Sequence, residues 1–397
     1  MLNAIQKFYK PKETRYLTHS FHPYPNKLVP QVARTIIKEY TKENNTILDP
    51  FVGSGTTLIE ANLLKRNSIG IDLNPLACLI SKVKTTPLEI NKLNDVTKKL
   101  LDDSHFNLKR NGSLRDFTDR INPDIPEFPK REYWFQKDAL IGLSVLKELI
   151  NKIEDVEIKD FCLVAFSSII KECSNASSLY KLTKLEEPKR ISKLDVTCKF
   201  REKINQMIES INTYNLKTNS NFIEIHQKDS RYLRDIDEAD FVITNPPNFS
   251  LDFPRCFKIH FWWLNLDDIK KLDRMMIGTK KINGKLINLN IDCADNLINK
   301  IKEKNHCMGI ALSKYYYDIR QVLTQMHRLL KEDKYCCINV SDCVLHGNPI
   351  RAPDTYIELA KQAGFKLDKR IKRIVPKKAL VFASKDKIEE LLVFKKT

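Results

Sequence analysis

The residues with the clearest chemical potential are two glycines and two carboxylates near the start of the chain. An apolar run ends at Leu48, and Gly53 and Gly55 follow it closely, as in a buried strand that enters a tight turn. Because glycine lacks a Cβ, this turn lets a ligand approach the backbone. Asp72 ends the next apolar run, 23 residues after Asp49, which is the spacing of one strand-helix-strand unit with a carboxylate for ribose hydroxyls.

Two other interpretations of this turn stay open on the residues alone. A glycine-rich turn can bind nothing, and nicotinamide-binding folds use a similar unit. The segment from Gly53 to Gly55 lacks the third glycine of the dinucleotide fingerprint, and Asp49-Pro50-Phe51 precedes it. These departures count against a dinucleotide site.

A third apolar run ends in Asn245-Pro246-Pro247, which offers hydrogen-bond acceptors at the end of a strand. The prolines fix φ and have no N–H, so the Asn245 side-chain oxygen and the Pro246 carbonyl are candidate acceptors without a competing donor. An amino group conjugated with an aromatic ring is a poor nucleophile until such acceptors draw its nitrogen toward tetrahedral geometry. Transfer of a group to that nitrogen needs alignment and electrostatics more than a covalent nucleophile.

These residues must be positioned by the elements of an α/β sheet. Strands and helices alternate from about residue 32 to 83, helical periodicity replaces them over 88–219, and the sheet resumes at 222–226. The later elements expected are helices over 317–330 and 353–363 and strands over 336–340, 366–371 and 391–394. The predicted fold class is a doubly wound α/β sheet with a largely helical insertion, divided into 1–87, 88–219 and 220–397.

The segment from Asp49 to Thr57 resembles the cofactor motif of DNA methyltransferases that modify exocyclic amino groups, giving N4-methylcytosine or N6-methyladenine. The segment 21–30 resembles the part of this family that closes over the methionine end of the cofactor. Tyr315 to Asp318, before a long helix and a strand, is similar to its closing half, although Asp318 also suits a helix N-cap. The resemblance implies a class I methyltransferase fold and S-adenosyl-L-methionine as the cofactor.

The resemblance also implies roles for single residues. Asp72 is expected to hold the cofactor ribose and Asp229 to contact its adenine, although a helix N-cap explains Asp229 as well. The expected cofactor-binding residues are His22, Tyr24, Asp49, Phe51, Gly53, Ser54, Gly55, Thr56, Asp72 and Asp229. The expected catalytic residues, which orient a base extruded from the duplex, are Asn245, Pro246, Pro247 and Phe249.

One position departs from the family pattern. An aromatic residue usually follows the two prolines and stacks on the flipped base, but Asn248 stands there in this chain. Either Phe249 or another aromatic such as Phe253 takes that place, or the enzyme is weak or inactive.

The formal net charge of +17 suits a polyanionic partner but does not distinguish DNA from RNA. Residues 181–203 contain eight Lys or Arg against four acids. A solvated helix face or loop is one interpretation of this segment, and a DNA-contacting lobe is the other. The candidate DNA-binding residues are Lys189, Arg190, Arg255, Arg370 and Arg373.

Composition bounds the cellular context. The ten cysteines include no Cys-x-x-Cys pair and the histidines show no metal-ligand spacing, so neither a zinc site nor a disulfide framework is expected. No apolar run approaches the length of a membrane span, and no signal peptide is expected at the first residues. The prediction is a soluble cytoplasmic protein without metal or membrane attachment.

The resemblance implies a site-specific methyltransferase acting on double-stranded DNA in a restriction-modification system, with a cognate restriction endonuclease as an expected partner. Cytosine N4 is slightly favoured over adenine N6, because the His-Pro-Tyr-Pro element looks closer to the N4 group, whereas asparagine before Pro-Pro is more common among adenine enzymes. One alternative is a tRNA guanine-N2 methyltransferase, although only 48 residues precede Asp49, where such enzymes normally carry an RNA-binding domain. The other is a catalytically impaired DNA-binding homologue, for which Asn248 is the argument.

Overall fold

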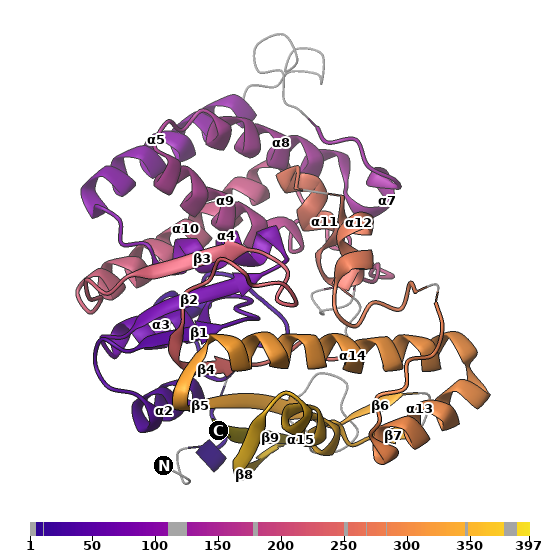
Figure 1. The fold of residues 1–397 in the computed structure, drawn as a ribbon. Coiled ribbons are helices and arrows are strands. Elements are labelled where there is room, and N and C mark those ends of the chain that lie inside the picture. Colours follow the sequence, from indigo (N-terminus) through magenta and orange to yellow (C-terminus); the bar gives the residue numbers. More distant parts are fainter. Residues whose placement is uncertain are drawn as a thin grey trace.

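The computed structural model of the chain describes residues 5–10, 12–109, 125–177, 182–249, 253–266, 268–282, 284–345, 348–376 and 387–397. Within them, seven strands form one sheet in the order β3-β2-β1-β4-β5-β9-β8 (Figure 1). The strands are β1 (Thr46–Asp49), β2 (Asn67–Asp72), β3 (Ile223–Gln227), β4 (Ala239–Thr244), β5 (Leu330–Ser341), β8 (Phe365–Val375) and β9 (Lys387–Lys396). The first five in the sheet order pair in parallel, and β9 runs antiparallel to β5 and β8. The predicted α/β fold class is confirmed, since helices accompany this mixed sheet.

Helices cover both faces of this sheet. They are α2 (Pro30–Tyr40), α3 (Thr56–Leu63), α4 (Pro75–Thr85), α13 (Asp292–Lys304), α14 (His306–Leu329) and α15 (Ala352–Gln362). Phe241 and Cys337 share a core with α2 on one face, while their chain neighbours Val242 and Cys336 share a core with α14 and α15 on the other. Successive strand residues point to opposite faces, so the central strands carry apolar residues on both faces, and all six residues of β4 are buried.

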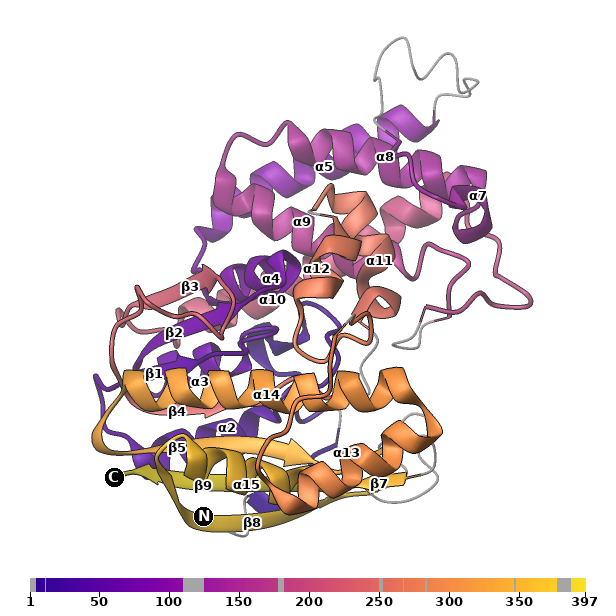
Figure 2. The same ribbon diagram turned by 45° about the vertical axis from the view of Figure 1, so that its right-hand side comes forward.

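A group of helices stands beside the β3 side of the sheet (Figure 2). Its members are α5 (Ile90–Lys109), α7 (Arg131–Trp134), α8 (Lys137–Asn151), α9 (Val156–Ile170), α10 (Lys193–Asn215), α11 (Phe253–Leu264) and α12 (Ile269–Met275). One apolar core joins them to α4, and Phe257, Phe261 and Trp263 of α11 are buried in it. The aromatic segment that follows Asn-Pro-Pro therefore serves mainly as core for the helical group.

One predicted helix boundary is wrong. The helix expected from residue 317 begins at His306, because the Asn305 side chain accepts a hydrogen bond from the Met308 N–H at 3.0 Å and caps the helix there. Asp318 accordingly lies inside α14 and is not its N-cap. The remaining elements are a 3₁₀ turn, η1 (Leu17–Ser20), and a hairpin of β6 (Cys343–Leu345) and β7 (Asn348–Ile350).

None of the helices in the described ranges combines the length and the apolar character that a bilayer crossing requires.

Candidate active site

The glycine turn joins β1 to α3 through two left-handed residues. Gly53 has φ +51° and Gly55 has φ +80°, a conformation that L side chains rarely adopt. A Cβ on Gly55 would also approach Ser81 Cα to 3.1 Å. The turn carbonyls are held by side chains of α4: Ser81 Oγ donates to Gly53 O at 2.9 Å, and the buried Lys84 Nζ donates to Ser54 O at 3.0 Å.

Asp49 ties the turn to the end of β4. Its carboxylate accepts hydrogen bonds from Thr57 Oγ1 at 2.6 Å, Thr244 Oγ1 at 2.7 Å and the Phe51 N–H at 3.1 Å. Burial raises its pKa to about 6, against the effect of these donors. Asp49 thus fixes the two strand ends relative to each other.

Asp72 ends β2 directly beside the glycine turn. Its two oxygens accept from the Gly53 N–H at 3.0 Å and from the Asn74 N–H at 2.9 Å. Burial raises its pKa to about 6, and the backbone donors oppose that rise. Asn74 continues the network, because its Nδ2 donates to the Tyr24 hydroxyl at 3.1 Å.

Asn245 follows the last residue of β4 and lies between two partners. Its Nδ2 donates to the backbone carbonyl of Asn26, and its Oδ1 accepts from Asn339 Nδ2 at 3.0 Å. Pro246 beside it is buried, and Pro247 O accepts from the Tyr315 hydroxyl at 3.1 Å.

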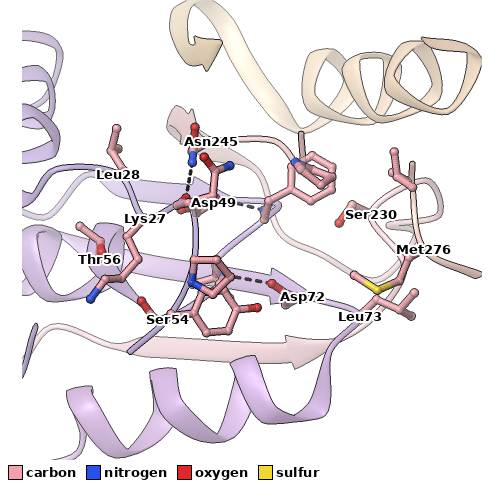
Figure 3. Close-up of a pocket in the computed structure, with 18 of the residues that line it drawn as sticks. Lys27, Leu28, Asp49, Ser54, Thr56, Asp72, Leu73, Ser230, Asn245 and Met276 are labelled. Carbon is pink, nitrogen blue, oxygen red and sulfur yellow. Dashed lines mark hydrogen bonds between the residues drawn. The ribbon is translucent and has the colours of Figure 1, made fainter. Parts of the chain in front are cut away.

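The tips of β1, β2 and β4 line one cavity of about 910 Å³ of atom-free space, partly open to solvent. Figure 3 shows Lys27, Ser54 and Thr56 toward one end of it and Ser230 and Met276 toward the other. The predicted site residues that line it are Tyr24, Asp49, Phe51, Gly53, Ser54, Thr56, Asp72, Asp229, Asn245 and Pro247. The structure therefore brings most of the predicted cofactor residues together with Asn245.

A second cavity, with about 400 Å³ of atom-free space that includes open solvent, adjoins the first at the Asn245 corner. Asn26, Asn245 and Pro247 belong to the walls of both cavities. The second cavity has an aromatic and amide lining, which includes Pro246, Asn248, Phe249, Tyr315, Tyr316, Asn339 and Tyr356. A planar ring with polar edges suits such walls, and it would lie next to whatever occupies the first cavity.

Two predicted cofactor residues are not among the residues that line the first cavity. His22 is buried between the N-terminal segment and α9, where its ring nitrogens contact Pro23 O at 2.8 Å and Ser167 Oγ at 3.0 Å. Burial lowers the pKa of His22 well below its ordinary value, so the ring is neutral. Gly55 faces Ser81 and shapes the turn from behind. Both residues support the site from outside the cavity wall.

Asp229 lines the first cavity, but its carboxylate is already paired. Arg231 reaches it through Nη2 at 2.6 Å and contacts the Asp318 carboxylate at 3.1 Å through Nη1. The structure does not support Asp229 as a helix N-cap, because a turn and not a helix follows it. Its neighbour Ser230 donates a hydrogen bond to Pro50 O and lines the cavity too.

Sequence reasoning missed Lys27, Leu73 and the segment Met275–Ile277, all of which line the first cavity. Lys27 lies inside the segment 21–30, close to the predicted residues His22 and Tyr24. Its Nζ donates to His19 O at 3.3 Å, and enclosure by protein, with a smaller effect of nearby Arg15, lowers its pKa to about 8. The Met275–Ile277 segment comes from α12 and the turn after it, and no motif in the sequence marks it.

Phe249 lies in the wall of the second cavity, where an aromatic side chain was expected. It is buried, and its ring centroid is 5.4 Å from that of Tyr315. Asn248 lines the same cavity. The side chain of Phe253 lies outside the described residues.

The candidate DNA-binding cations fall into three groups. Lys189 and Arg190 are exposed in the connection before α10. Arg370 contacts Glu390 and Asp354, and Arg373, only 4% exposed, contacts Glu389 at 2.8 Å. The side chain of Arg255 lies outside the described residues. Pairing of β8 with β9 thus gives Arg370 and Arg373 internal partners, which argues against their role as free phosphate contacts.

Comparison with known proteins gives this geometry a family context. Residues 3–83 match the family model described as DNA methylase, of the N6/N4 methyltransferases. The chain is 27% identical over 353 residues to Type II methyltransferase M.MvaI of Kocuria varians, covering 81% of this chain and 76% of that protein. It is 31% identical over 137 residues to Type II methyltransferase M.MjaII of Methanocaldococcus jannaschii, covering 34% of this chain and 26% of the relative.

Proposed function

Because the chain belongs to the N6/N4 DNA methylase family and is an S-adenosylmethionine-dependent amino-group DNA methyltransferase, we propose that it methylates cytosine N4 at a specific DNA sequence. One observation carries the proposal: Asp72, the glycine turn and Asn245 line one cavity, and a second cavity opens from the Asn245 corner. This arrangement supports transfer between a cofactor held in the first cavity and a base held in the second.

The residues that line the first cavity suit the chemistry of S-adenosyl-L-methionine. Asp72 is the acceptor for ribose hydroxyls, and Gly53 leaves room beside it, since a Cβ there would lie 3.3 Å from Tyr24 Cε1. We assign Lys27, beside Ser54 and Thr56, to the carboxylate of the cofactor, because α3 begins at Thr56 and helix N-termini also favour anions. Ser230 and Met276, toward the other end, are assigned to the adenine (Figure 3).

The chain's own contribution to the reaction is orientation. When bound, the cofactor supplies a methyl group on a positively charged sulfur. Asn245 Oδ1 accepts a hydrogen bond from the base amino group and orients the lone pair of the amino nitrogen toward that methyl. The neutral amide takes no proton, so the proton that the methylated nitrogen loses goes to solvent. Phe249 and Tyr315 form the aromatic wall against which the base lies, in place of the residue after Pro-Pro.

In this proposal, DNA approaches the Asn245 corner along α12. Met275 and Met276 at the end of α12 line the first cavity, and Lys270, Lys271 and Arg274 on the same helix are exposed. Within the described residues no ion pair is recorded for these three cations. Together with the exposed Lys189 and Arg190, these three cations support a role for the group of helices beside β3 in binding DNA phosphates. We therefore propose this group of helices as the DNA-contacting lobe.

The choice of base and the cellular context are part of the same proposal. Cytosine N4 is favoured by the resemblance of residues 21–30 to the N4 group. Because two relatives are named Type II methyltransferases, we extend the proposal to a restriction-modification system with a cognate endonuclease, acting in the cytoplasm.

Sequencing that detects modified bases tests the function directly. DNA from a methylation-free host that expresses the chain should carry N4-methylcytosine at one defined sequence, while DNA from a host expressing the Asn245→Ala variant should carry none. Methyl groups on adenine N6 would overturn the choice of base. Methyl groups found on tRNA and not on DNA would overturn the substrate.

A further inference from the structure

Asn339 is a buried amide in an otherwise apolar part of β5. It is 9% exposed and stands between Ile338 and Val340, and its Nδ2 donates to Asn245 Oδ1 at 3.0 Å. A buried polar group in such a strand costs stability unless it is hydrogen-bonded. This partner is the side chain proposed to bind the target amino group.

The contacts of Asn245 define which way its amide points. Its nitrogen faces the backbone carbonyl of Asn26, which can only accept a hydrogen bond. The oxygen of Asn245 must therefore face Asn339, on the side of the second cavity. A 180° rotation of the amide would set oxygen against carbonyl oxygen at one end and NH₂ against NH₂ at the other, so the two contacts select a single orientation.

We propose that Asn339 is a positioning residue that holds Asn245 Oδ1 at the wall of the second cavity. An amide oxygen has two lone pairs, and Asn339 uses one of them. The other stays directed at the amino group of the base. This inference rests on the role of Asn245 in the proposed function.

The neighbouring elements explain why β5 supplies this residue. β4 and β5 pair in parallel with Thr244 beside Ile338, so the residues that follow each partner, Asn245 and Asn339, come side by side at the carboxyl end of the sheet. Asn26, the third member, belongs to the N-terminal segment that also supplies Tyr24 and Lys27 to the first cavity. The amide chain from Asn339 to Asn26 therefore links the wall of the base cavity to the wall of the cofactor cavity.

The test separates the positioning of Asn245 from the binding of the cofactor. Asn339→Leu removes the donor at similar size, and Asn339→Asp replaces it with an acceptor that favours the wrong orientation of Asn245. In single-turnover assays on plasmid DNA from a methylation-free host, Asn339→Leu should slow methyl transfer about 10-fold and Asn339→Asp more, since one neutral hydrogen bond is removed in the first and opposed in the second. Affinity for S-adenosylhomocysteine should stay within about 2-fold of the wild-type value in both.

The matched control is Asn221→Leu. It removes hydrogen bonds to Asn44 and Asn67 at 3.1 Å near the start of β3, at the opposite edge of the sheet, and should leave the transfer rate unchanged. A wild-type rate in Asn339→Leu overturns the inference, as does a loss of rate matched by loss of S-adenosylhomocysteine binding. Substantial transfer by Asn245→Ala overturns the proposed function itself, which is a separate outcome.

Discussion

The cofactor side and the base side of the active site are built in different ways. On the cofactor side, Asp49 and Asp72 accept hydrogen bonds mainly from donors within residues 49–74, and Thr244 Oγ1 at the end of β4 gives one more to Asp49. On the base side, the wall comes from widely separated places in the chain: Asn26, the Asn245 corner, α14, β5, Ile350 of β7 and α15. A local unit thus forms the centre of the cofactor side, to which Lys27, Ser230 and Met276 are added from elsewhere in the chain, while the base side depends on tertiary structure throughout.

The difference extends to electrostatics. Asp49, Asp72 and Lys27 bring charge to the first cavity, whereas the second is lined by neutral amides, hydroxyls and rings. Charged groups suit a zwitterionic cofactor with ribose hydroxyls, and neutral acceptors with aromatic walls suit a nucleobase. Substitutions on the two sides should therefore fail in different ways, one in binding and the other in turnover.

The largest effect is expected on the base side. Asn245→Ala removes the acceptor for the amino group, and we expect methyl transfer to fall about 1000-fold or more, because this hydrogen bond acts on the reacting nitrogen. Affinity for S-adenosylhomocysteine, measured by calorimetry, should change little. If S-adenosylhomocysteine affinity fell by the same factor as the transfer rate, the two sides of the site would not have the separate functions proposed here.

A smaller effect, of the opposite kind, is expected at Asp72. Asp72→Ala removes charged acceptors for ribose hydroxyls and leaves the Gly53 N–H without its partner, so S-adenosylhomocysteine should bind about 100-fold more weakly. Transfer at saturating cofactor should be affected much less. Asp72→Asn, which keeps one oxygen, should lie between wild type and alanine, and an asparagine variant weaker than alanine would contradict this explanation.

Substitutions of Lys27 test how much its charge contributes to cofactor binding in the first cavity. Lys27→Met should weaken S-adenosylhomocysteine about 10-fold, since the variant has no charged donor for the carboxylate. Binding of 5′-methylthioadenosine, which lacks that carboxylate, should not change, and Lys27→Arg should retain most of the affinity. Equal losses of affinity for both ligands would show that Lys27 shapes the cavity without touching the carboxylate.

The same lysine predicts a pH dependence. Its pKa is about 8 in the free protein, and a bound carboxylate would raise it. A group whose pKa is raised on binding favours binding at low pH, so wild-type affinity should decline as the pH is raised through 8 toward the pKa of the complex. Lys27→Met should lose this decline, and titration calorimetry between pH 7 and about 9.5 would show it.

The two sides also differ in how far the sequence could predict them. The cofactor side follows from local geometry: a glycine turn, a strand end and a 23-residue spacing place Asp72 beside Gly53, and the hydrogen bond between them is present at 3.0 Å. Asn339 could not be found in this way, because Cys336 to Val340 is an apolar run in which one amide carries no spacing signal. Its importance depends on the register of β5 against β4, which tertiary packing decides.

Two of the predicted DNA-binding cations have ion-pair partners that a local reading of the sequence does not reveal. Arg370 and Arg373 look like free charges in the sequence, but β8 pairs with β9 so that Glu389 and Glu390 neutralise them. Strand pairing joins residues about 20 positions apart, and a local charge count does not contain it. Lys270, Lys271 and Arg274, in contrast, gain significance only because α12 ends at the cavity.

The smallest effects are expected where DNA phosphates are bound. Changing Lys270, Lys271 and Arg274 together to Gln should weaken DNA binding and flatten its salt dependence, by about 0.9 in the slope of log K against log salt for each phosphate that is no longer neutralised. Arg373→Gln should leave that slope unchanged and lower the free energy of unfolding instead, because Glu389 is deprived of a buried partner. Fluorescence titrations with duplex DNA at several salt concentrations, and urea denaturation, measure the two quantities.

A matched triple variant at the opposite end of the strands controls for net charge. Lys38, Lys42 and Lys65 are exposed near the starts of β1 and β2, so their replacement by Gln removes the same three charges away from the strand tips that form the site. If DNA approaches past α12, the control should keep nearly the wild-type slope, because surface charges farther than a Debye length of about 10 Å from the phosphates are screened. Equal flattening in the two triple variants would instead mean that DNA responds to overall charge, and the base side would then have no defined approach along α12.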